Sequence, residues 1–201
     1  PPAAAAERIR RFREMQAADS ASRELRWNWN TPFFLSAHDP DVFYAAANRV
    51  LKSTTLGEGL EPISPDLTGQ DPEKIRVSTR TTGGITPDVT GAETHATIVS
   101  LEESPLVRGK LFAGTDDGNV WMTTDDGGSW TELTARFREL VPDSTYVSRI
   151  EASHHDPARF YVTFDNHRRN DFAPYVLVSD DDGGSFRSIA SNLPADGPDF
   201  V

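Results

Sequence analysis

The sequence predicts an all-β protein: a β-propeller segment of about three four-stranded blades, preceded by an N-terminal helix. From Arg26 onward, short apolar or alternating runs are bounded by Gly, Pro, Asp or Asn, which is typical of strands and tight turns. Three successive segments share one layout of four such runs, and each has the length of a propeller blade. One such unit cannot bury both of its faces, so these units are expected to stack around an axis.

The first expected element is a helix within the N-terminal segment 1–25. Strong helix formers dominate it, and Ile9, Phe12 and Met15 recur at steps of three. A basic amphipathic helix can lie on a membrane surface or on a partner. Three apolar residues are few for that purpose, so docking on its own domain, or a linker role, is the favoured interpretation. Membrane contact is expected only indirectly, through this helix.

The expected domain organisation follows from the repeats. In chain order it is blade 1 at 26–68, an extended inter-blade loop at 69–93, blade 2 at 94–140, blade 3 at 141–194 and the start of a further blade at 195–201. A closed propeller has about four to eight blades. We therefore expect the chain to be part of a longer polypeptide, with the remaining blades or another protein as its partner.

A turn motif appears twice, with the pattern S/T-x-D-x-G-x-S/T-W/F. Its members are Thr123, Asp125, Gly127, Ser129 and Trp130 in blade 2, and Ser179, Asp181, Gly183, Ser185 and Phe186 in blade 3. Gly permits a positive φ, the Asp accepts backbone N–H groups of its own turn, and the aromatic ring packs between sheets. Oxygen-rich turns also suit calcium, but the ligand spacing of a calcium loop is missing. A structural role is therefore expected.

This motif resembles the Asp-box, or bacterial neuraminidase repeat, of sialidases, xyloglucanase-type glycoside hydrolases and the sortilin ectodomain. Residues 27–201 look closest to the exported bacterial sortilin-like propellers that carry such repeats. The resemblance implies a propeller fold and an extracellular or periplasmic location. It does not imply one activity, because these repeats occur in enzymes and non-enzymes. Blade 1 keeps Ser53 and Gly57 but has Thr55 and Leu60 at the Asp and aromatic positions, so its hairpin should be less well tied.

The loop after the second strand of blade 3 is the candidate binding site, because its counterpart in blade 2 is much shorter. It contains Asp165, Asn166, His167, Arg168, Arg169, Asn170 and Asp171. The arginine pair can bind a carboxylate or phosphate. Equally, the arginines can pair with the surrounding acids and only order the loop. Both interpretations stay open.

Composition excludes several classes of function. The chain has 31 acidic against 20 basic residues, which argues against nucleic-acid binding, and no cysteine, which excludes disulfides and thiolate metal sites. His38 and His155 occupy equivalent turns and look structural. His154 beside His155 hints at a metal, but no third ligand is evident. No metal and no cofactor are expected.

The favoured function is a non-catalytic exported scaffold that binds a protein or a glycan, as a segment or subunit of a larger assembly. No nucleophile elbow, phosphate loop or zinc helix is present. The alternative is part of a xyloglucanase- or sialidase-like glycoside hydrolase. Catalysis would need two carboxylates at a fixed separation, and the many acidic residues leave its catalytic residues unassigned.

Overall fold

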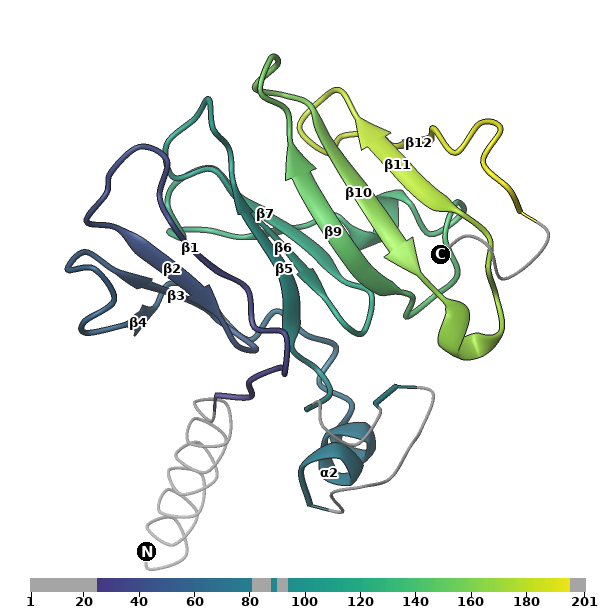
Figure 1. Cartoon of the computed structure of the whole chain (residues 1–201), viewed down its shortest axis with the longest axis horizontal. Coiled ribbons are helices and arrows are strands. Elements are labelled where there is room, and N and C mark those ends of the chain that lie inside the picture. The colour runs from purple at the N-terminus through teal and green to yellow at the C-terminus, as the bar shows by residue number, and fades with distance from the viewer. Residues whose placement is uncertain (1–24, 81–87, 90–93, 196–201) are drawn as a thin grey trace, which may run out of the picture.

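The computed structural model describes residues 25–80, 88–89 and 94–195, and their strands form three four-stranded antiparallel sheets (Figure 1). In each sheet, strands consecutive in the chain are neighbours. The N-terminal helix expected in segment 1–25 lies outside the described residues except for residue 25. The same holds for the further blade expected at 195–201, apart from residue 195.

Each sheet falls within one of the three predicted blade segments. Blade 1 consists of β1 (Phe33–Leu35), β2 (Phe43–Ala46), β3 (Val50–Ser53) and β4 (Glu61–Pro62). Blade 2 consists of β5 (Ile98–Glu103), β6 (Leu111–Thr115), β7 (Val120–Thr123) and β8 (Thr131–Glu132). Blade 3 consists of β9 (Tyr146–Ala152), β10 (Phe160–Asp165), β11 (Tyr175–Ser179) and β12 (Arg187–Ser188). Two 3-10 turns, η1 (Thr134–Arg136) and η2 (His167–Arg169), complete the blades.

The blades stack face to face, and apolar side chains fill both interfaces. Since side chains alternate along a strand, Leu111 of β6 faces blade 1 whereas Phe112 faces blade 3. The Phe112 ring lies 4.5 Å from that of Phe160, centroid to centroid. In the interface between blades 1 and 2, Tyr44 belongs to the same cluster as Leu111. Blade 2 therefore buries both of its faces.

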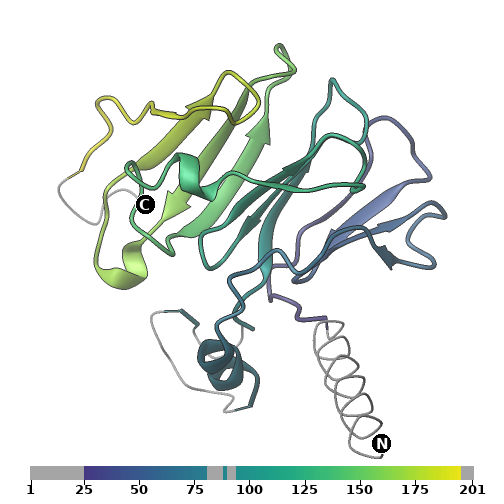
Figure 2. The same ribbon diagram turned by 180° about the vertical axis from the view of Figure 1, so that it is seen from behind.

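The first strand of each blade lies on one side of the stack, and β5 and β9 run next to each other (Figures 1 and 2). Their contact includes a hydrogen bond from the Ile150 N–H to Ser100 Oγ, 2.8 Å long. We call β1, β5 and β9 the inner strands. Because the strands are antiparallel, the two motif turns lie at the end of the blades opposite to the loop that joins β10 and β11.

The connector 69–93 differs from the extended loop that the sequence predicts, since it contains helix α2 (Pro72–Arg80). Asp71 Oδ1 accepts the N–H groups of Glu73 and Lys74 at 3.0 and 3.2 Å, which caps the helix. Pro72 is favourable at the first helical position, and Glu73 pairs with Arg76 one turn later. Low apolar content did not prevent a helix here, because local capping and pairing support it. α2 lies outside the sheets, beyond one end of the blades (Figure 2).

Candidate binding site

In each motif turn, the carboxylate of the first Asp accepts hydrogen bonds from its own turn. In blade 2, Asp125 Oδ1 accepts the Thr123 hydroxyl at 2.7 Å and the Ser129 N–H at 2.8 Å. Asp125 Oδ2 accepts the Ser129 hydroxyl at 2.8 Å. These hydrogen bonds, that from Thr123 first, hold the pKa of the Asp125 carboxyl below its usual range. A carboxylate with so many internal donors has little capacity left for a ligand.

The blade 3 turn repeats this geometry. Asp181 accepts the hydroxyls of Ser179 and Ser185 at 2.9 and 2.7 Å, and the Ser185 N–H at 2.9 Å. The aromatic positions serve packing: Trp130 Nε1 donates to the Ile63 carbonyl of blade 1 at 2.9 Å, and Phe186 packs edge-on against Phe160. In blade 1, Ser53 Oγ still accepts the N–H groups of Thr55 and Gly57, each at 3.1 Å. Its hairpin thus forms without the Asp.

His38 and His155 occupy equivalent turns that share a backbone hydrogen bond, but the two histidine rings have different surroundings. The N–H groups of His38 and His155 each donate to a serine two residues earlier, at 3.1 Å in both blades. The His38 ring hydrogen-bonds through Nε2 to the Ser104 carbonyl of blade 2 at 2.8 Å, while His155 is exposed. Among the described residues, no group of three or more His, Cys, Asp or Glu could hold a metal ion. No described helix is long and apolar enough to cross a membrane.

The loop predicted as a binding site brings its polar residues together around η2. The His167 ring pairs with Asp165, 2.6 Å from Nδ1 to Oδ1. Asp171 Oδ2 accepts Asn166 Nδ2 and the Tyr175 hydroxyl, both at 2.8 Å. Asn170 has a left-handed φ of 58°, which an asparagine tolerates. The loop is therefore ordered largely by its own side chains.

The arginine pair of this loop contacts the connector. Arg169 Nη2 lies 3.2 Å from Asp88 Oδ1, and Arg168 Nη1 donates to the Asp88 carbonyl at 3.0 Å. Lys74 of α2 binds the same Asp88 Oδ1 at 2.9 Å. Asp88 and the two arginines line, together with Asp116 and Tyr146, a cavity of about 180 Å³. The Arg169 charge is thus matched by a carboxylate of the same chain.

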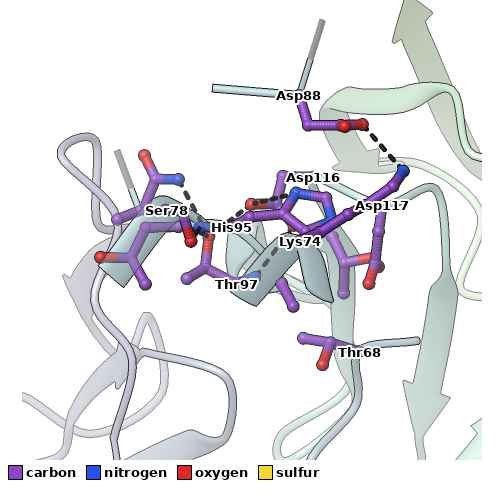
Figure 3. Close-up of polar contacts among 12 residues, drawn as sticks. Thr68, Lys74, Ser78, Asp88, His95, Thr97, Asp116 and Asp117 are labelled. Carbon is purple, nitrogen blue, oxygen red and sulfur yellow. Dashed lines mark hydrogen bonds and ion pairs between the residues drawn. The ribbon is translucent and has the colours of Figure 1, made fainter. Parts of the chain in front are cut away.

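Beside this cavity lies a buried polar cluster that sequence reasoning missed (Figure 3). Asp116 accepts the N–H and the hydroxyl of Thr97, each at 2.9 Å. Burial, with Asp117 nearby, raises the pKa of Asp116 to about 8. The His95 ring, 2% exposed, lies 3.8 Å from Asp116 Oδ2, and neither ring nitrogen has a hydrogen-bond partner in the described part of the chain. Burial lowers the pKa of His95.

A groove with a volume of about 540 Å³ runs along the inner strands. We call it the inner groove. Phe33 and Leu35 of β1 line it, and they are 67% and 52% exposed. Its polar side chains include Glu102 of β5 with Arg149 and Ser148 of β9. Exposed apolar side chains next to a few charged groups are typical of a binding surface.

Charged groups cluster at one side of the inner groove. Arg149 Nη2 lies 2.8 Å from Glu151 Oε2 and 3.8 Å from Glu102 Oε2. Burial and then the Glu151 charge raise the pKa of Glu102 to about 7. The His154 ring lies 3.9 Å from Glu151. Sequence reasoning missed this cluster because Glu102 and Arg149 lie on two inner strands about fifty residues apart. Only the alignment of β5 with β9 in the repeats could have indicated it.

Comparison with solved structures identifies the architecture. The chain aligns with the GH74 xyloglucanase from Xanthomonas campestris at a TM-score of 0.50 and 18% identity, over 81% of this chain and 23% of that one. The fold is a β-propeller segment. Weaker alignments are found with the GH74 enzyme from Niastella koreensis (TM-score 0.42, 16% identity, 77% of this chain and 17% of that one). A further weak alignment is with YCF48 bound to D1 peptide (TM-score 0.31, 11% identity, 74% of this chain and 50% of that one).

The alignments cover only a part of each GH74 enzyme. The propeller segment spans less than a quarter of the length of either GH74 enzyme. No model of a protein family matches the chain, and no curated protein matches its sequence. At these identities the alignments establish the fold alone.

Proposed function

We propose that this β-propeller segment is a non-catalytic scaffold that binds a protein or glycan partner in the inner groove. The observation that carries the proposal is the exposure of Phe33 and Leu35 in a groove of about 540 Å³. A rigid, exposed aromatic ring can stack on a sugar or anchor a peptide side chain. Glu102 and Arg149 supply hydrogen-bonding groups of both charges beside it. The motif turns support the proposal as well, because the carboxylates of Asp125 and Asp181 bond within their own turns and are not offered to a ligand.

The substitution Phe33→Ala tests the proposal. The wild-type chain is screened on a glycan array that includes xyloglucan oligosaccharides and sialylated glycans, and on a peptide array. For the probe that binds, we expect Phe33→Ala to weaken binding about tenfold or more, measured by calorimetry, because a central aromatic anchor is lost. Leu140→Ala is the matched control, since Leu140 is 38% exposed and lies outside the groove lining. Failure of every probe, or equal losses for both variants, contradicts the proposal.

A second candidate function, part of a glycoside hydrolase, is favoured by one observation. A carboxylic acid that holds its proton near pH 7 beside an ionised carboxylate is the arrangement that glycoside hydrolysis requires. Glu102 has such a raised pKa, and Glu102 and Glu151 both lie within 3.8 Å of the same Arg149 nitrogen. Glu102 would then donate the proton to the leaving group, and Glu151 would act as the base or nucleophile.

Hydrolysis assays separate this candidate from the scaffold. If it holds, wild-type protein cleaves a glycan such as xyloglucan, and Glu102→Gln lowers kcat at least about a hundredfold. The rate should fall as the pH rises through about 7, because Glu102 then loses the proton it donates. Glu132→Gln, at an exposed position of β8, is the control. Absence of cleavage, or an active Glu102→Gln enzyme, leaves the scaffold as the function.

We further propose an exported, extracellular or periplasmic location and a place in a larger assembly. Both rest on the resemblance of the motif turns to Asp-box repeats and of residues 27–201 to sortilin-like propellers. The arginine pair of the β10–β11 loop is assigned a structural role, because both arginines contact Asp88.

A further inference from the structure

In both motif turns, the residue after the first Asp has a different role from that Asp. Asp126 and Asp182 have left-handed φ values of 59° and 57°. Their N–H groups donate to the carbonyl that precedes the second strand of the same blade, at 2.9 Å to Gly109 and 3.0 Å to Ala158. Their side chains point to the preceding blade. We call these residues the latch acids.

Each latch acid binds polar side chains of the preceding blade. Asp126 of blade 2 accepts the Tyr44 hydroxyl of blade 1 at 2.9 Å and pairs with Lys52 of blade 1. Asp182 of blade 3 pairs with Lys110 of blade 2, whose side chain is only 5% exposed. Burial and then Asp126 raise the pKa of Tyr44, so its hydroxyl keeps the proton that it donates. The same charge complementarity thus repeats at both interfaces.

Blade 3 carries both kinds of donor on its other face. Tyr161 holds the position of Tyr44, and Arg159 holds that of Lys110, one residue before the second strand. Phe160 and Val162 face blade 2, so Tyr161 and Arg159 face away from it. Arg159 Nε contacts Asp180, and its two terminal nitrogens have no hydrogen-bond partner among the described residues. This donor pair has no latch acid in the described part of the chain.

The matching position in blade 1 is different. Leu56 has the same left-handed φ, 57°, and its N–H makes the equivalent hydrogen bond to the Asp41 carbonyl at 2.9 Å. Its side chain is apolar and 64% exposed. The open face of blade 1 therefore has the latch geometry without the acid.

We propose that the open face of blade 3 docks a further propeller blade whose turn carries Asp or Glu at the latch position, and that Tyr161 and Arg159 bind this acid. The partner is a blade other than a copy of this chain, because blade 1 offers Leu56 there. The proposal is independent of any ligand in the inner groove.

An engineered partner made from the same chain tests this. The variant Leu56→Asp/Arg159→Ala has a latch acid on blade 1 and no cation on blade 3. Mixed with wild-type chain at low salt, it should form a 1:1 complex in sedimentation velocity. Its association constant should be at least about tenfold above that of Arg159→Ala mixed with wild type, because one charge pair across the interface is added. Leu60→Asp/Arg159→Ala is the matched control, since it adds the same charge to the same hairpin off the latch position.

Two outcomes overturn the proposal. The first is a loss of specificity in the mixing experiment. The Leu56 and Leu60 variants would then associate equally with wild type, or association would persist when the wild-type chain is replaced by one with Arg159→Ala and Tyr161→Phe. The second concerns the latch between blades 2 and 3, which a double-mutant cycle with Lys110→Met and Asp182→Asn measures. If the latch joins blades, the effects on the unfolding equilibrium constant are non-additive by about tenfold. Additive effects mean that the acid does not couple neighbouring blades.

Discussion

Asparagine in place of Asp116 should raise the free energy of unfolding at pH 8 by about 3 kcal/mol, while leaving it nearly unchanged near pH 4. Asp116 has a raised pKa of about 8 in the folded protein, so folding takes up a proton between about pH 4 and 8. Its contribution to stability is complete below its unfolded pKa and is lost as the pH rises through 8. Asparagine is neutral throughout and can still accept the Thr97 N–H. Urea unfolding of both proteins across this pH range measures the difference.

His95 affects the pH dependence of stability in the opposite direction to Asp116. Burial lowers its pKa, so its contribution is lost as the pH falls below its ordinary value of 6.5. Because both proteins contain His95, this loss largely cancels in the difference. Asp143→Asn is the control, because Asp143 is an exposed carboxylate. If Asp116→Asn is the less stable protein at pH 8, Asp116 is ionised in the fold and the interpretation is wrong.

Alanine at the turn glycines should destabilise the protein in a graded series, with the largest effect at Gly127. Gly57, Gly183 and Gly127 hold one turn position with φ values of 98°, 75° and 90°, so alanine pays a similar conformational cost of about 1 kcal/mol at each. A Cβ on Gly57 would meet Phe43 at an ordinary 3.7 Å. On Gly183 it would lie 2.8 Å from Leu133 Cδ1, and on Gly127 2.5 Å from the Ile63 carbonyl oxygen.

The neighbouring blade explains the order of the series. Leu133 belongs to blade 2 and can shift its side chain, whereas the Ile63 oxygen is backbone of blade 1 and cannot move without that blade. We expect losses of about 1, 2 and 3 kcal/mol for Gly57→Ala, Gly183→Ala and Gly127→Ala, from chemical denaturation. Gly57→Ala is thus the matched control for the blade contact. Equal losses in all three would mean that only the backbone conformation matters.

The repeats allowed the blades to be predicted because each strand pair closes locally. Every hairpin of blade 2 lies within some forty residues, and its pattern of apolar runs and turn residues reads directly from the sequence. The hydrogen bonds of the first Asp of each motif are also local, because they reach a residue only four positions away. The Asp-box family assignment itself stays a prediction.

Contacts between segments that are distant in sequence could not be predicted. Asp126 meets residues 74 and 82 positions earlier, and no local pattern distinguishes it from Asp125. The buried His95–Asp116 pair depends on the contact of α2 with the residues before β5, which one sequence does not show (Figure 3). Helix α2 was missed because its support is a proline and paired charges rather than apolar periodicity.

The latch acids bear on the order in which the blades can assemble during synthesis on the ribosome. Each latch acid reaches back to a blade that precedes it in the chain, and each motif glycine presses against that same earlier blade. For these contacts, a blade emerging from the ribosome meets an earlier blade that has already been translated. We expect the blades to be added one by one in the order of translation, so that translational pauses after each blade would favour correct assembly.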